Sequence, residues 1–113
     1  MEPGEGCREL SPRECFLLIE GSPGERCIIL DVRTADEFRG GHLGGAENLD
    51  YYRPDFKELI SSRDKAPRYI VYCRKGSRGK KTLEIMRECG FRDVTNISGG
   101  FENWMASGLP VKR

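Results

Sequence analysis

The chain has 113 residues, of which 33% are charged and 37% hydrophobic, and its formal net charge at pH 7 is +1. This length suits one domain with one core, and the clustering of the apolar residues argues against a disordered chain. A net charge so close to zero gives no general affinity for nucleic acid or for a membrane surface. No apolar run approaches the ~20 residues that a membrane-spanning helix needs.

The cysteine pattern bears on the redox compartment. The five cysteines are Cys7, Cys15, Cys27, Cys73 and Cys89. Their number is odd and no two have C-x-x-C spacing, so neither a disulfide framework nor a zinc site is predicted. The polar start of the chain shows no signal-peptide or lipid-attachment pattern. The expected location is therefore the reducing cytoplasm, with an exported or organelle-targeted form left open if a leader has been removed.

The chain begins with a short strand and a capped helix. Residues 7–10 are expected to form an edge strand, after a frayed start over residues 1–6. Ser11 as N-cap, Pro12 at the first helical position and Glu14 closing a capping box predict a helix start. The Gly-Ser-Pro-Gly run at 21–24 is expected to end this helix.

A second strand and helix follow the same order. Residues 27–32 form a continuous apolar run, which is typical of a strand covered on both faces. Thr34 and Glu37 form a second capping box that opens a short helix through Phe38. The glycine-rich residues 40–45 predict a turn, and residues 46–49 predict another short strand.

The second half continues the alternation of strands and helices. Helices are predicted over residues 54–61, 80–89 and 101–106, and strands over residues 68–72 and 93–97. Gly90 is placed at the C′ position of the helix that ends at Cys89. Strands alternating with helices imply an α/β fold in which a parallel sheet has helices on both faces.

Cys73 lies between the carboxyl end of a predicted strand and the start of a helix. Ligands bind at this edge in open α/β sheets, and the loop amides and helix dipole there favour an anion. From Arg74 to Lys81 there are five basic residues and no acidic one. Gly76 allows the loop to turn tightly. Together these features predict a reactive thiolate at Cys73 that holds an anionic substrate beside it.

Each feature by itself has a simpler interpretation. A lone cysteine at a strand end is usually a small buried apolar residue, and a basic run is usually a solvated face. The strand before Cys73, the helix after it and the glycine within the loop favour the reactive cysteine over these alternatives.

Four stretches resemble the single-domain rhodanese family. They are Leu30-Asp31-Val32-Arg33 with Glu37-Phe38; Gly41-His42-Leu43 with Gly45-Ala46 and Asn48; the Cys73 loop; and Gly99-Gly100-Phe101 with Trp104, Gly108, Pro110 and Val111. They cover nearly the whole chain and occur in the family's order. The resemblance implies a rhodanese-like three-layer α/β/α fold with a central, mainly parallel five-stranded sheet. It makes residues 1–113 a single rhodanese-like domain with a core at about 11–111.

The resemblance also implies a chemistry. Cys73 is the expected catalytic residue, and it carries sulfur as a persulfide while it moves a sulfane sulfur from thiosulfate to a thiol or to cyanide. Arg74, Lys75, Gly76, Ser77 and Arg78 form the loop that binds the anionic donor, with Arg74 and Lys75 on its sulfonate end. Arg78 is expected either to bind the donor or to brace the loop by pairing with a carboxylate. No metal and no organic cofactor is needed.

Residues outside the loop are given supporting roles. Asp31 and Arg33 are expected to pair and shape the rim of the site. His42, the single histidine, is expected to be structural, because a thiolate activated by dipoles needs no histidine. Trp104 is assigned to the core. Tyr51 and Tyr52 either line the mouth or are exposed loop aromatics.

Two positions depart from the family's pattern. Gly44 stands where the family often has Pro, which should only loosen the turn. Gly79 stands where the family often has Ser, so a hydroxyl that could bond the loop or the persulfide is missing. This second departure bears on the rate and leaves the chemistry unchanged.

Three alternatives to the thiosulfate enzyme stay open. A sulfur-relay protein would take persulfide sulfur from a partner protein. A phosphatase or arsenate reductase on the same fold is less favoured, because only four residues separate Cys73 from Arg78, one fewer than in the Cys-x5-Arg loop of tyrosine phosphatases. A binding module would commonly lack the cysteine.

Overall fold

A computed structural model describes residues 6–22 and 26–113; most of the frayed start and part of the predicted helix stop at 21–24 lie outside these ranges. The strands are β1 (Cys7–Leu10), β2 (Cys27–Asp31), β3 (Glu47–Asn48), β4 (Arg68–Tyr72) and β5 (Val94–Ile97). The helices are α1 (Pro12–Glu20), α2 (Ala35–Arg39), α3 (Phe56–Ser61), α4 (Ser77–Glu88) and α5 (Gly100–Ala106).

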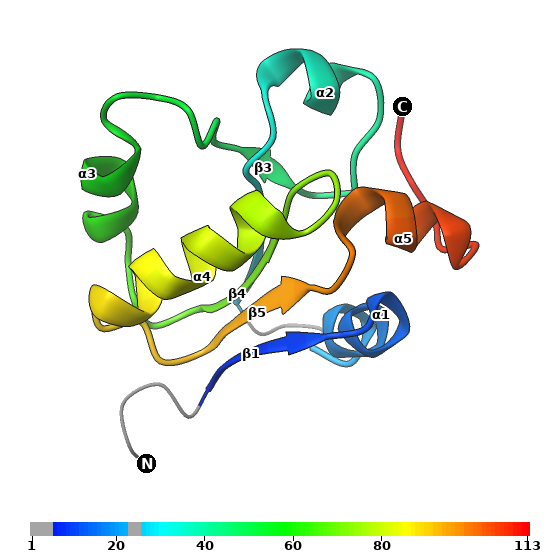
Figure 1. Cartoon of the computed structure of the whole chain (residues 1–113). Coiled ribbons are helices and arrows are strands. Elements are labelled where there is room, and N and C mark those ends of the chain that lie inside the picture. The colour runs from blue at the N-terminus through cyan, green and yellow to red at the C-terminus, as the bar shows by residue number, and fades with distance from the viewer. Residues whose placement is uncertain (1–5, 23–25) are drawn as a thin grey trace.

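The five strands form one sheet in the order β1-β5-β4-β2-β3, and every neighbouring pair is parallel. The predicted parallel sheet is therefore confirmed. Because all strands run the same way, their carboxyl ends meet at one edge of the sheet. β4 lies in the middle of this order, so the loop that follows Tyr72 emerges near the centre of that edge (Figure 1).

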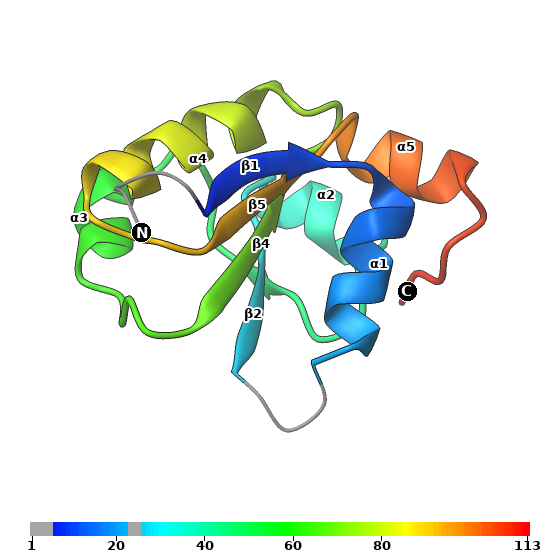
Figure 2. The same cartoon turned by 90° about the horizontal axis from the view of Figure 1, so that it is seen from below.

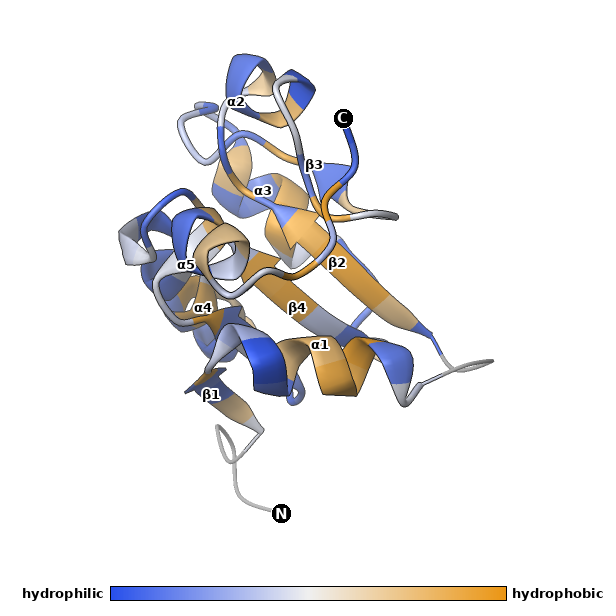
Figure 3. Ribbon diagram, turned by 90° about the vertical axis from the view of Figure 1, so that its right-hand side faces the viewer, coloured by the Kyte–Doolittle hydropathy of each residue, from blue (hydrophilic) through white to orange (hydrophobic). Residues whose placement is uncertain are grey.

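Helices cover both faces of the sheet, which makes the three layers that the sequence predicted. α3 and α4 lie on one face, and α1 and α5 lie on the other (Figure 2). Apolar residues of β2 and β4 alternate between two clusters: Leu30 and Val71 pack toward α3 and α4, while Ile29 and Ile70 pack toward α1 and α5. β2 and β4 are accordingly apolar along most of their length (Figure 3), as expected for strands buried on both faces.

Both predicted capping boxes are present. The Ser11 hydroxyl accepts a hydrogen bond from the Glu14 amide at 3.1 Å, and the Glu14 carboxylate accepts one from the Ser11 amide. Thr34 and Glu37 repeat this arrangement at the start of α2. Such caps satisfy amides that have no partner within the helix, so both helix starts follow from local sequence.

α4 begins at Ser77, three residues before the predicted start at Lys80. Gly76 has a φ of +117°, and its carbonyl already accepts a hydrogen bond from the Lys80 amide at 2.9 Å. The left-handed glycine turns the chain straight into the helix, whereas the prediction treated residues 77–79 as loop. As a result, Gly79 belongs to the first turn, where helix amides have no intrahelical acceptor.

β3 and α3 are also shorter than predicted, by two residues each. β3 covers Glu47–Asn48 instead of residues 46–49, because the Ala46 amide closes a turn onto the Leu43 carbonyl at 3.1 Å. α3 begins at Phe56 instead of residue 54, because its amide bonds the Arg53 carbonyl in a preceding turn. None of the helices in the described ranges combines the length and apolar character needed to cross a membrane.

The turn at residues 40–45 offers a matched test of backbone conformation. A Cβ atom at either Gly44 or Gly45 would meet nothing within 4 Å, but only Gly45 has a left-handed φ, +81°. We therefore expect Gly44→Ala to stabilise the fold by about 0.4–1 kcal/mol, because alanine reduces the conformational entropy of the unfolded chain. Gly45→Ala should destabilise it by about 1–2 kcal/mol. Urea unfolding of both variants checks this, and equal effects of the two substitutions would contradict it.

Candidate active site

Cys73 lies at the carboxyl end of β4, with only 1% of the residue exposed. Its Sγ atom accepts hydrogen bonds from two backbone amides, those of Gly76 at 3.1 Å and Gly79 at 3.2 Å. One amide comes from the tight loop and the other from the first turn of α4. The sulfur is therefore surrounded by N–H dipoles at the positive end of a helix, an arrangement that stabilises negative charge on sulfur.

The start of α5 holds the Cys73 loop from the other side. The Phe101 amide donates to the Cys73 carbonyl at 2.8 Å, and the Glu102 amide donates to the Arg74 carbonyl at 3.0 Å. This close approach requires glycine at residue 100: its φ is +63°, and a Cβ atom there would lie 2.5 Å from the Cys73 carbonyl oxygen. The Gly-Gly pair before α5 thus lets one helix start dock onto the loop.

Arg78 braces the loop against α2. Its guanidinium donates to both carboxylate oxygens of Glu37, at 2.9 and 3.2 Å, and both side chains are largely buried. The hydrogen bond from Arg78, together with those from Thr34, lowers the pKa of Glu37 to about 2. The charge of Arg78 is therefore matched by a carboxylate. Of the two roles expected for Arg78, this pairing corresponds to bracing the loop.

The two tyrosines of the β3–α3 connection have different surroundings. Tyr52 is 67% exposed and its ring lies over the Arg78 guanidinium, 5.6 Å from ring centre to Cζ. Tyr51 is half-buried and its ring packs edge-on against Phe56 at 5.1 Å. Tyr52 therefore flanks the loop brace, while Tyr51 belongs to the packing around α3.

The remaining basic residues of the loop differ in how free their charges are. Arg74 is exposed and its Nε donates to the Glu102 carboxylate at 2.8 Å. Lys75 is also exposed, and among the residues that the structure describes it forms no ion pair. Lys75 is thus the loop cation with the most freedom to meet an incoming anion.

Asp31 and Arg33 do form a pair, but it is buried instead of lying at the rim. Asp31 is 0% exposed and Arg33 3%, and the guanidinium donates to both carboxylate oxygens at 2.7–3.1 Å. Arg33 also donates to the Gly41 carbonyl and lies 4.2 Å above the Phe101 ring. The pair therefore fixes the 40–45 turn and the base of α5, which in turn contacts the Cys73 loop.

His42 and Trp104 both have structural surroundings. The His42 ring stacks on Phe38 at 3.8 Å, and its Nδ1 lies 2.9 Å from the Phe38 carbonyl oxygen. The backbone of His42 pairs with that of Lys112 in an isolated antiparallel bridge. Trp104 is 2% exposed and its indole N–H donates to the Pro110 carbonyl. Both residues therefore tie the end of the chain to the domain.

The other cysteines lack the environment of Cys73. Burial raises the pKa of Cys15 to about 12. Burial also raises the pKa of Cys7 and of Cys27. All five thiols are free. The Cys73 sulfur, by contrast, accepts hydrogen bonds from two backbone amides at the start of α4.

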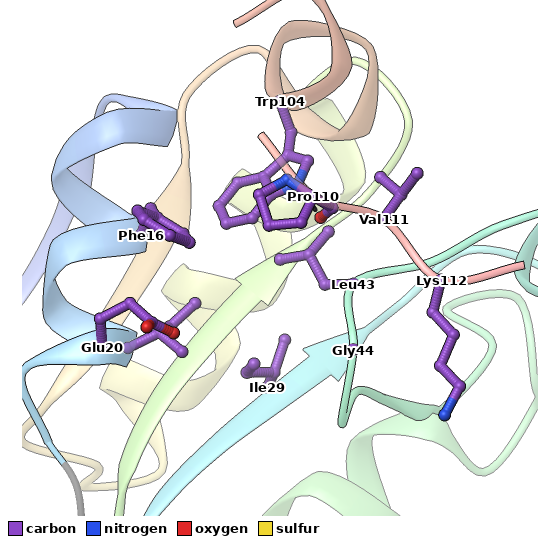
Figure 4. Close-up of a pocket in the computed structure, with 10 residues that line it drawn as sticks. Phe16, Glu20, Ile29, Leu43, Gly44, Trp104, Pro110, Val111 and Lys112 are labelled. Carbon is purple, nitrogen blue, oxygen red and sulfur yellow. Dashed lines mark hydrogen bonds between the residues drawn. The ribbon is translucent and has the colours of Figure 1, made fainter. Parts of the chain in front are cut away.

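A hollow of about 220 Å³ lies between α1, α5 and the C-terminal segment, away from Cys73. Its walls are mainly apolar, and the rings of Phe16 and Trp104 lie side by side at one end of it, 6.1 Å apart (Figure 4). The hollow belongs to the α1–α5 face, whereas Cys73 packs with the cluster on the α3–α4 face. It is therefore separate from the candidate site.

Sequence reasoning did not identify three contributors to the site. The sequence places Glu37, the partner of Arg78, in a capping box and in a family motif but does not pair it with Arg78, and it gives no role to Glu102, the partner of Arg74. The amide of Gly79 was placed in a loop. The excess of basic residues after Cys73 was a signal that carboxylates should lie nearby, but it could not say which ones.

Comparisons with known proteins place the chain in a family. The sequence model of the rhodanese-like domain matches residues 17–107, and the chain belongs to this family. It is 39% identical over 93 residues to thiosulfate sulfurtransferase 16, chloroplastic, of Arabidopsis thaliana, covering 74% of this chain and 78% of the relative. It is 29% identical to the thiosulfate sulfurtransferase GlpE of Actinobacillus pleuropneumoniae, covering 92% of each chain.

Solved structures share the fold. A rhodanese-related protein from Thermoplasma volcanium superposes with a TM-score of 0.80 over 93% of this chain and 97% of that one, at 22% identity. The rhodanese-like domain of a protein from Anabaena sp. gives a TM-score of 0.77 over 99% of this chain and 80% of that one, at 26% identity. The α/β architecture predicted from the sequence is therefore that of rhodanese-like domains.

The brace between Glu37 and Arg78 should make stability depend on pH. Because the folded pKa of Glu37 is lowered from 4.5 to about 2, its contribution is complete above pH 4.5 and is lost as the pH falls toward 2. We expect Glu37→Gln to cost on the order of 1–2 kcal/mol at pH 7. The deficit should shrink progressively below pH 4.5.

Urea unfolding at pH 7, 4 and 3 measures this difference between native and variant protein. Glu88→Gln, at an exposed position of α4, is the charge-matched control and should change stability by less than about 0.5 kcal/mol. A deficit of Glu37→Gln that stays constant from pH 7 to pH 3 would show that the ion pair does not contribute.

Proposed function

We propose that this chain is a thiosulfate sulfurtransferase that carries the transferred sulfur as a persulfide on Cys73. The observation that carries the proposal is the convergence of the Gly76 and Gly79 amides on the Cys73 Sγ atom, at 3.1 and 3.2 Å. The names of its relatives, thiosulfate sulfurtransferases from a plant and a bacterium, support the same substrate.

In the first half-reaction, the Cys73 thiolate attacks the outer sulfur of thiosulfate. A bond forms between Sγ and that sulfur, the sulfur–sulfur bond of thiosulfate breaks, and sulfite leaves with the electron pair. Cys73 then holds one extra sulfur as a persulfide. Backbone amides that surround the sulfur stabilise the charge on it without having to reorganise, as an oxyanion hole does for oxygen.

In the second half-reaction, a thiolate acceptor or cyanide attacks the outer persulfide sulfur. The acceptor gains that sulfur, the bond to Sγ breaks, and the Cys73 thiolate is regenerated. No oxidant or reductant besides donor and acceptor takes part. The same step would serve an acceptor thiol on a small molecule or on a partner protein, so a sulfur relay uses the same site.

The charges around the loop suit a small sulfur anion better than a phosphoryl group. Arg78, the residue that would hold phosphate in a Cys-x5-Arg loop, is occupied by Glu37 through two hydrogen bonds. Two backbone amides, one from the loop and one from the first turn of α4, already point at a single sulfur atom. Lys75, with Arg74 beside it, would receive the sulfonate end of thiosulfate through charge-assisted hydrogen bonds.

Replacement of Cys73 is the central test. Cys73→Ser should lower sulfur transfer from thiosulfate to cyanide to the level of the uncatalysed reaction, because the hydroxyl cannot form a persulfide. Single replacements of Cys7, Cys27 and Cys89 by Ala are the matched controls and should retain activity. Mass spectrometry after thiosulfate treatment should show about 32 Da of added mass on the peptide that contains Cys73, which corresponds to about one sulfur atom per chain.

Three outcomes would overturn the assignment. Turnover by Cys73→Ser would remove Cys73 from the mechanism, and so would loss of turnover in a folded variant at another cysteine. Hydrolysis of an aryl phosphate by the native protein as fast as it transfers sulfur would favour the phosphatase alternative.

Lys75 should act on the donor's charge. Thiosulfate is a dianion, and each charge-assisted hydrogen bond to it contributes about 1.5–3 kcal/mol. We expect Lys75→Ala to lower kcat/KM for thiosulfate by on the order of 10-fold or more, with a smaller loss for an uncharged sulfur donor. Lys57→Ala, an exposed lysine on α3, is the control. Equal losses with both donors would mean that Lys75 supports the loop instead of the substrate.

A further inference from the structure

Asn96 of β5 is buried beneath the Cys73 loop and hydrogen-bonds it at Gly76. The residue is 0% exposed, and its side-chain Nδ2 donates to the Glu9 carboxylate at 2.7 Å and to the Gly76 carbonyl at 3.4 Å. Because a carboxylate can only accept, the contact with Glu9 determines which end of the amide faces β1. The other end, Oδ1, has no hydrogen-bond partner within the described residues.

The Oδ1 end of Asn96 lies against Gly79. A Cβ atom added to Gly79 would lie 2.2 Å from Oδ1, 3.1 Å from Cγ and 3.5 Å from Nδ2 of Asn96. Contacts of 2.2 Å do not occur between real atoms of these types, so any side chain at residue 79 must displace either Asn96 or the first turn of α4. All three atoms lie beyond the Cβ of Asn96, so alanine at residue 96 would remove every one of these contacts.

Gly79 is one of the two residues whose amides meet the Cys73 sulfur. Its N–H donates to Sγ at 3.2 Å, and the other donor, Gly76, contacts Asn96 through its carbonyl. Asn96 therefore contacts both residues that supply the amides, Gly76 at its carbonyl and Gly79 where a Cβ atom would lie. It is held in turn by Glu9 on the neighbouring strand β1.

We propose that Asn96 is a positioning residue of the sulfur-carrying site, and that it restricts residue 79 to glycine. The carbonyl end of its side chain sets how close the first turn of α4 lies to β5, and this distance sets the direction of the Gly79 amide. The family's frequent serine at this position would find its space occupied by Asn96. This proposal deepens the proposed function and rests on it for its effect on catalysis.

The test is a double-substitution cycle with Gly79→Ala, Asn96→Ala and the combination of both. Alanine is the smallest probe of the space, and in an ordinary helix position it is preferred to glycine. Gly79→Ala alone should lower kcat for thiosulfate by on the order of 10-fold or more, because one amide is turned away from the sulfur. KM should change by less than about 2-fold, since the residues proposed to meet the donor's charge are untouched.

The combination should be no worse than Asn96→Ala by itself, because the alanine at residue 79 then occupies the space that the asparagine leaves. Asn96→Ala alone should lower kcat by about 2- to 5-fold, which is a smaller loss than that of Gly79→Ala. Thr95→Val is the control from the same strand and should leave kcat unchanged. Like Asn96, Thr95 is buried and has a side-chain oxygen with no hydrogen-bond partner in the described part of the chain.

Amide hydrogen exchange of Gly76 gives a second reading that needs no sulfur transfer. Its N–H is bonded to the Cys73 sulfur, so Gly79→Ala should speed its exchange by about 10-fold, and the combined variant should restore it. The proposal is overturned if Gly79→Ala leaves both kcat and exchange unchanged, or if the combined variant is as impaired as Gly79→Ala. If the native protein transfers no sulfur, the proposed function fails, while the exchange measurements still decide whether Asn96 positions the loop.

Discussion

The structure depends on one arrangement, the pair of backbone amides that meet the sulfur of Cys73. Two N–H groups can reach one atom only if the chain reverses sharply and enters a helix at once, because helix amides remain free of intrahelical acceptors only in the first turn. Gly76, with its φ of +117°, makes that reversal, and α4 begins at the next residue. Two backbone dipoles thus point at one sulfur atom, where they favour negative charge.

The other elements act by holding this loop in place. α5 donates two amides to the Cys73 and Arg74 carbonyls, α2 supplies Glu37 to Arg78, and β5 places Asn96 beneath the loop. These contacts come together because parallel strands deliver their carboxyl ends to one edge of the sheet. Arg78 and Glu37, which meet in one of these contacts, are 41 residues apart in the chain, so the site requires the folded domain.

Charge at the site is more ordered than the composition suggests. The chain is nearly neutral overall, and two of the basic side chains beside Cys73 are matched by carboxylates, Arg78 by Glu37 and Arg74 by Glu102. These ion pairs hold the loop against α2 and α5. In the proposed function, the amides and Lys75 meet the anion, an arrangement that would suit a small donor approaching a single sulfur atom more than a phosphoryl group with three oxygens to satisfy.

The sequence by itself determined the alternation of strands and helices, both capping boxes and the place of Cys73 at a strand end. These features depend on hydrogen bonds and side-chain periodicity within a few residues, so they can be recognised locally. Only the tertiary structure decided that Glu37 pairs with Arg78, that the Asp31–Arg33 pair is buried, and that Asn96 fills the space beside Gly79. Such contacts join segments that are distant in the chain, and which segments meet is decided by how the sheet and its helices pack.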